Sequence, residues 1–470
     1  MASIVWLNVV GLPDFAKNAI HDELIKHGFD LNFSTARLSW HQGIVAEEIN
    51  FGSSKILGDS QIFIDSLKID LDLKCLFSGR FAVNSIELKN AKLSIPLQGS
   101  KHDQQFVIEN LNLHLDFPET NLWHITAANF NCLGADFSLS GYVTNIVKAK
   151  MEGAKTTESK ALSITLQNQL AKLCEVSKEI RYSKPPKLFA AFKADAACPW
   201  SVEGSIKFSC DNLSSKWINA TNIFSSFYFD FQTNTTIAPY LNVSCEVKVG
   251  GVNSTNLLVD SLHVKGKTRI STKDRTFKDL ITTVNFSKVQ FKGATIARPD
   301  IFLQLVKQTN SSEYELDLCI KADNLADKTL QITRFDGYFK RAISDLEFNQ
   351  ILKLYERPIL SNNSSSEENI SLLLKDWKSD FSCQTVRLAQ QELNNLNAVI
   401  KFYSNNNTNS PIHSSAPELI HKIGLVGCDF NIRTDSAFIR STDIYNIQVS
   451  GIWSPPTLEI TQVHASLLDG

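Results

Sequence analysis

The segment HDELIKH brings together residue types that can hold a metal ion, namely His21, Glu23 and His27. Two metal ligands share one face of a helix when they are four residues apart. His21 and His27 are six residues apart, which at about 100° per residue places them about 240° apart around a helix. The spacing therefore favours a solvated helix face and does not predict a metal site.

Cysteine side chains can bind zinc or form disulfides, but the spacing of the nine cysteines in this chain indicates neither chemistry. The closest two, Cys198 and Cys210, are twelve residues apart, so the chain has no C-x-x-C motif. Cys245 and Cys319 lie in alternating apolar runs, where cysteine commonly serves as a small buried hydrophobic residue. Because the count is odd, a fully paired disulfide framework is not expected, and the redox compartment stays open.

The common motifs of enzyme active sites are absent from the sequence. It contains no G-x-G-x-x-G or G-x-x-x-x-G-K-[ST] loop for phosphate and no G-x-S-x-G nucleophile turn. Its 47 basic and 49 acidic residues give a formal net charge of -2, which provides no field to hold nucleic acid. Lys265, Lys267 and Arg269 could touch anionic headgroups, although a solvated strand face is the simpler interpretation. We expect a non-enzymatic protein with no metal and no cofactor.

Strict alternation of apolar and polar residues is the main pattern of the chain. Leu67, Ile69 and Leu71, for example, alternate with Lys68 and Asp70. Such alternation predicts antiparallel strands with one wet face and excludes a buried parallel sheet. Strands of about five or six residues are typical, and about twenty are predicted here. Further clear runs cover residues 111–117, 135–139, 227–231, 241–247, 314–320 and 445–453.

Three helices are predicted, over residues 11–28, 157–182 and about 341–356. Pro13 suits the first turn of the first helix, and Gly28 ends it. Pro185 and Pro186 follow the second helix and prevent its continuation. Three helices cannot cover so much apolar sheet, so the other face must meet a second sheet, close into a barrel or stay open for a ligand. Composition does not decide among these arrangements.

The amino-terminal sequence, from VVGLPDFAKNAIHDELIKHGFDLNF to HQGIVAEEINFG, resembles the first unit of AsmA-like proteins, the bacterial envelope family that includes TamB. The stretch FIDSLKIDLDLKCLFSGRFAVNSIELKNAKLSI continues the likeness, and the ending VSGIWSPPTLEITQVHASLLDG resembles a strand and turn found within longer members. The likeness covers about the first 145 residues and the last 25. The matching positions are Gly11, Leu12, Pro13, Gly28, Leu31, Phe33, Trp40, Gly43, Ile44, Ile49, Asn50, Phe51, Leu71, Leu76, Gly79, Val83, Ile86 and Leu88.

The resemblance implies a mainly β fold, in which a long curved antiparallel sheet forms an open apolar groove. It also implies a periplasmic protein, anchored to the inner membrane, that binds or conducts phospholipid between the inner and outer membranes and contributes to outer-membrane biogenesis. Its partners would be phospholipid acyl chains, the inner membrane and an outer-membrane protein. The expected lining of the groove is Leu67, Ile69, Leu71, Leu111, Leu113, Leu115, Phe137, Leu139, Phe227, Phe229 and Phe231.

The expected organisation starts with residues 1–10, MASIVWLNVV, as the remnant of a membrane anchor or an ordinary buried strand. Residues 11–145 form the AsmA-like helix and β-groove unit, 146–190 a helical insertion and linker, and 191–470 a continuing, truncated groove. The chain would then be a fragment of a longer protein. Two other classes stay open: a secreted or periplasmic β-rich binding or adhesion module with a closed core, and a hydrolase on a β-helix, which the missing carboxylate pairs disfavour.

Overall fold

The chain divides into two compact units, residues 1–241 and 242–470. The computed structural model describes Gly11 and residues 31–39, 43–51, 61–71, 83–97, 105–119, 121–146, 159–234, 237–271, 276–308, 313–344, 346–348, 376–404, 426–454 and 457–467. The first predicted helix, residues 11–28, lies outside this part of the chain except for Gly11. The described strands belong to one sheet of 24 strands, against the roughly twenty predicted.

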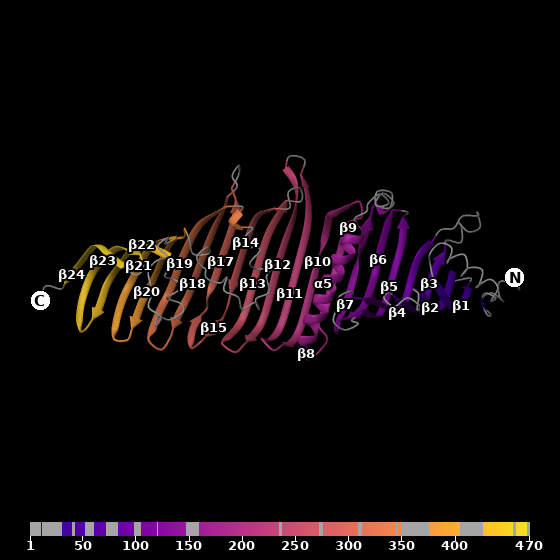
Figure 1. The fold of residues 1–470 in the computed structure, drawn as a ribbon, viewed down its shortest axis with the longest axis horizontal. Coiled ribbons are helices and arrows are strands. Elements are labelled where there is room, and N and C mark those ends of the chain that lie inside the picture. Colours follow the sequence, from indigo (N-terminus) through magenta and orange to yellow (C-terminus); the bar gives the residue numbers. More distant parts are fainter. Residues whose placement is uncertain are drawn as a thin grey trace. The chain divides into compact units, whose positions relative to one another are not determined.

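The first unit is built from neighbouring strands in chain order (Figure 1). Strands β1 to β7 pair consecutively and antiparallel, and β9, β10 and β11 do the same. The strands are β1 (Leu31–Ser39), β2 (Gly43–Phe51), β3 (Gln61–Leu71), β4 (Val83–Pro96), β5 (Gln105–Glu119), β6 (Leu122–Cys132), β7 (Ala135–Thr144), β8 (Arg181–Tyr182), β9 (Lys187–Asp195), β10 (Cys198–Ser214) and β11 (Asn219–Asn234).

The exception to antiparallel pairing in this unit is the parallel pair β7–β9. Parallel neighbours need a long crossover, and the helix α5 (Ser159–Glu179) provides it. The helix predicted over residues 157–182 is therefore confirmed in its body. Its predicted end is wrong, because Arg181 and Tyr182 pair with β10 as the short strand β8.

The second unit repeats the antiparallel arrangement, and β12 (Ile237–Asn253) crosses the division between the units. The order of pairing is β13, β14, β17 and then β18 to β24, while β15 and β16 form a hairpin between β13 and β18. The strands are β13 (Leu257–Ser271), β14 (Phe277–Asn285), β15 (Lys288–Phe291), β16 (Ala294–Ala297), β17 (Asp300–Lys307), β18 (Glu313–Ala326), β19 (Leu330–Ser344), β20 (Lys378–Leu388), β21 (Gln391–Ser404), β22 (Val426–Ile439), β23 (Thr442–Ser454) and β24 (Thr457–Leu467).

Many strands carry one extra residue at a common level, where the apolar spacing changes from two to three. In β3 the apolar series steps from Ile64 to Leu67, and in β4 it steps from Leu88 to Ala91. The two steps lie opposite one another, because Ile64 pairs with Ala91 and Leu67 pairs with Leu88. An extra residue of this kind bends a strand and strengthens its twist. Asparagine tolerates the left-handed backbone that such a bend needs. Within the strands, positive φ angles occur at Glu48, Asn90, Asn110, Asn222, Ser261, Arg334, Asn395 and Asn446.

Candidate functional site

The apolar residues of neighbouring strands form continuous rows across one face of the first unit. Because both members of each pair lie directly opposite one another, their side chains stand on the same side of the sheet. One row runs Leu67, Leu88, Leu113, Ala128, Leu139, Ala190, Ile206 and Phe227. The next row runs Ile69, Ile86, Leu115, Ile125, Gly141, Phe192, Gly204 and Phe229.

The remaining groove candidates from the sequence extend the same face. Leu111 lies opposite Ala91 in β4. The ring of Phe137 stacks on that of Phe130 with centroids 4.9 Å apart. Phe231 follows Phe229 at two-residue spacing in β11. The backbone of Leu71 pairs with β4, and its side chain lies outside the described part of the structure.

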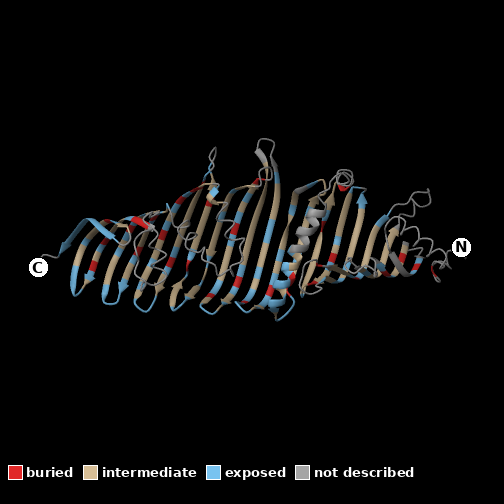
Figure 2. Ribbon diagram, in the orientation of Figure 1, coloured by how far each residue is buried: buried red, intermediate tan, exposed pale blue. Residues whose placement is uncertain are grey.

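This face holds few fully buried large side chains. Its fully buried residues include the small Ala128 and Cys132, whereas Phe227 keeps 39% of its surface exposed. Figure 2 shows residues of intermediate burial along most of the strands. Most of the large side chains in the two rows are of intermediate burial and therefore keep part of their surface exposed.

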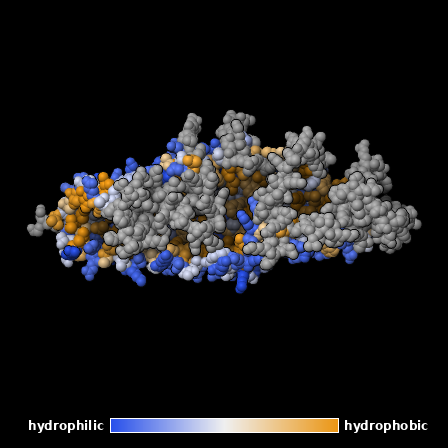
Figure 3. All heavy atoms as spheres, viewed as in Figure 1, coloured by the Kyte–Doolittle hydropathy of each residue, from blue (hydrophilic) through white to orange (hydrophobic). Residues whose placement is uncertain are grey.

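Hydrophobic side chains also gather in a hollow on the face turned to the viewer in Figure 3, in the region of β5 and β6. Hydrophilic side chains stand along the lower edge of that view. An apolar lining with polar edges is the arrangement expected of a surface that binds apolar ligands.

Helix α5 lies over part of this face (Figure 1). It contacts β5, and the buried thiol of Cys174 is close enough to that of Cys132 in β6 to influence its ionisation. Burial, together with a smaller contribution from the neighbouring Cys174, raises the pKa of Cys132 to about 11. Lys216 binds Glu179 at 2.7 Å and fastens the end of α5 to the turn between β10 and β11. Leu173 of α5 remains more than half exposed.

The second unit has an apolar face of the same design, none of which was among the residues predicted from the sequence. Alternating runs such as YELDLCI in β18 contained the signal, because every second residue of the run lies on this face. One row runs Val264, Val284, Ile301, Ile320, Gly337, Phe381, Ala398, Ile432, Val449 and Val463.

A helical turn over residues 346–348 covers one part of the second face. The ring of Phe348 packs 4.7 Å from that of Tyr314, and Glu347 binds the buried Arg341 at 3.0 Å. The helix predicted over residues 341–356 begins too early, because β19 continues to Ser344 through its pairing with β18. The rest of that predicted helix lies outside the described residues.

The basic residues that could touch anionic headgroups lie on the face of β13 opposite its apolar row. Lys265, Lys267 and Arg269 occupy alternate positions of β13, and Arg269 is paired with Asp279. The HDELIKH segment lies outside the described residues. Where the structure is described, no group of three or more His, Cys, Asp or Glu side chains could hold a metal ion. Among the described helices, none combines the length and the hydropathy that crossing a membrane requires.

The fold defines a mainly β protein with a partly exposed apolar sheet face in each unit. Comparison of the chain with family models, curated proteins and solved structures returned no match.

Proposed function

We propose that this protein binds phospholipid acyl chains along its apolar faces and conducts phospholipid between the inner and outer membranes. One observation supports the proposal: within each unit, apolar residues form rows across neighbouring strands, and most of their large side chains keep part of their surface exposed. Such rows offer a continuous apolar path, and no residue on it needs to react. The protein would then be non-enzymatic and would act by lowering the cost of moving an acyl chain through water.

The size of the first face suits an acyl chain. The row from Leu67 to Phe227 crosses eight strands, which at about 4.8 Å per interval gives about 34 Å. The hydrocarbon core of a bilayer is about 30 Å thick and holds two layers of acyl chains. A single acyl chain is thus shorter than the row. Each methylene removed from water contributes about 0.8 kcal/mol, so even partial contact along the row is strongly favourable.

The cellular setting of the proposal comes from the resemblance to AsmA-like proteins. On that ground we propose a periplasmic protein, anchored to the inner membrane, with an outer-membrane protein as a further partner in outer-membrane biogenesis. The alternative, a binding or adhesion module with a closed core, has less support, because large apolar side chains such as Phe227 stay exposed on the described face.

Native mass spectrometry of the purified protein tests the proposal directly. We expect phospholipid to accompany the wild type and to be lost in Leu113→Asp and Phe229→Asp. Ser205→Asp is the matched control, because Ser205 pairs with Tyr228 on the opposite face and should retain lipid. Circular dichroism must show the same strand content in all variants. A wild-type protein that purifies without lipid and fails to take up added phospholipid would contradict the proposal.

A further inference from the structure

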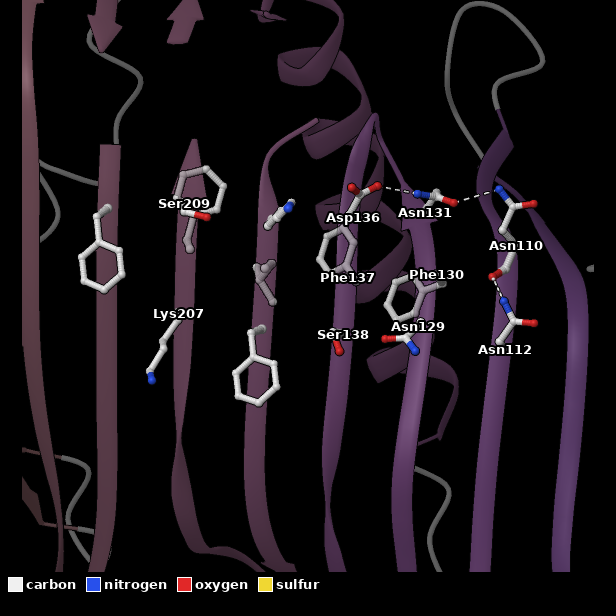
Figure 4. A pocket seen from close by; sticks show the side chains of 15 residues that line it. Asn110, Asn112, Asn129, Phe130, Asn131, Asp136, Phe137, Ser138, Lys207 and Ser209 are labelled. Atoms are coloured by element: carbon white, nitrogen blue, oxygen red, sulfur yellow. Dashed lines mark hydrogen bonds between the residues drawn. The ribbon is translucent and has the colours of Figure 1, made fainter. Parts of the chain in front are cut away.

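The polar face of the first unit carries a depression of about 560 Å³ across β5 to β11 (Figure 4). The register places Ser138 between Asn129 of β6 and Phe189 of β9, and it places Phe189 opposite Lys207 of β10. Alternation puts the intervening Leu188 on the apolar face. Most of the lining side chains thus stand on the face opposite the apolar rows, although Phe130, Phe137, Leu188 and Phe208 also belong to the lining. The volume falls within the usual range for small-ligand sites.

Asparagine side chains line one side of the depression in fixed orientations. Asn110 donates to Asn131 at 2.8 Å, and Asn131 donates to Asp136 at 2.6 Å (Figure 4). Asn112 donates to the backbone carbonyl of Asn110 at 3.0 Å. Each amide has two donor hydrogens and two acceptor lone pairs, so these exposed groups can bond further partners without reorienting. Paired donors and acceptors of this kind suit the hydroxyl groups of a sugar.

Two aromatic rings lie on the other side of the depression. Phe189 is 41% exposed and Phe224 is 36% exposed. Exposed rings of this kind are costly in water and offer a flat apolar surface. The apolar side of a pyranose ring can stack on such a surface while its hydroxyl groups reach the asparagine amides.

Two lysines give the depression its charge. Lys187 precedes Phe189 by two residues in β9, and Lys207 lies directly opposite Phe189 in β10. Neither lysine forms an ion pair with another residue in the described part of the chain. The lining acid, Asp136, already accepts a hydrogen bond from Asn131. The two ammonium groups therefore remain available to a ligand carboxylate, a charge-assisted contact that is stronger than a neutral hydrogen bond.

We propose that this depression binds an acidic saccharide, with Phe189 and Phe224 as the stacking surface, the asparagines as hydroxyl partners and the lysines as carboxylate partners. A binding site of this kind on the polar face would tether the protein to an anionic glycan while its apolar face stays free. The proposal does not depend on lipid binding.

Isothermal titration calorimetry with trigalacturonate, maltotriose and inorganic phosphate tests this proposal. We expect trigalacturonate to bind the wild type, and at least tenfold weaker binding to Lys207→Ala and to Phe189→Ser. Lys193→Ala is the matched control, because Lys193 lies on the same face of β9 opposite Glu203 and outside the depression. It should bind normally, as should Leu113→Asp.

Four outcomes would overturn the proposal. Absence of trigalacturonate binding to the wild type would exclude the site. Equal weakening by Lys193→Ala would show general charge attraction, and phosphate binding as tight as trigalacturonate would show a simple anion site. Maltotriose binding as tight as trigalacturonate would remove the role of the lysines. Circular dichroism of each variant separates lost binding from lost folding.

Discussion

Leu139→Asp is the most informative change on the apolar face of the first unit. Leu139 is the single large side chain over three successive strands of its row, because its cross-strand neighbours are Ala128 and Ala190. An acyl chain that follows the row must contact it. The adjacent Ser140 points to the polar face by alternation. Ser140→Asp is therefore the matched control, because it adds the same charge to the same strand away from the apolar face.

The size of the effect follows from the contact that is lost. Replacing the leucine removes contact with about two methylenes of the ligand, which at about 0.8 kcal/mol each is about 1.6 kcal/mol. Since about 1.4 kcal/mol is a factor of ten in affinity, binding should weaken about 15-fold. Desolvation of the new carboxylate by the ligand increases the loss.

Displacement of a fluorescent fatty acid by phospholipid measures this affinity in solution. The wild type and Ser140→Asp should give the same dissociation constant, and Leu139→Asp one at least tenfold higher. Urea unfolding of the two variants serves as the folding control, and both should remain cooperatively folded at the temperature of the assay.

Equal behaviour of the two variants would refute the reasoning. If both weaken binding, the added charge acts through the protein as a whole. If neither does, the lipid does not follow this row, and the apolar face has another occupant.

Three further outcomes test the structure. Gly141→Ala should lower the free energy of unfolding in urea by about 1–3 kcal/mol, because a Cβ there meets the backbone of β9; an unchanged midpoint would refute the close approach. Burial disfavours the thiolate of Cys132 and raises its pKa to about 11, so iodoacetamide at pH 8 should modify the exposed Cys198 first, and Cys132 only near pH 11 or after unfolding; equal rates by peptide mass mapping would contradict this. Glu347→Gln removes the charge beside Arg341, whose side chain is 2% exposed, and should lower the free energy of unfolding by about 1.5 kcal/mol in the same urea assay; an unchanged midpoint would refute a stabilising role for this pair.

Much of the apolar face could be predicted because side-chain direction in a strand is a local property. Leu113 and Leu115 must share a face in any strand that contains them, and the alternating run identified both. The helical spacing of Leu166 and Leu170 likewise predicted α5. The ends of elements were less accurate, since Arg181 and Tyr182 leave the helix to pair with β10, which lies more than thirty residues ahead.

The sequence alone thus determined that this protein is a sheet with one apolar and one polar face, because successive Cβ atoms of a strand point to opposite faces. Only the tertiary structure decided which strands are neighbours, because backbone hydrogen bonds can join any two extended segments. It set β9 parallel to β7 and lined up the extra residue of strand after strand. It also brought Asn110 and Phe224, more than a hundred residues apart, to the same depression on the polar face.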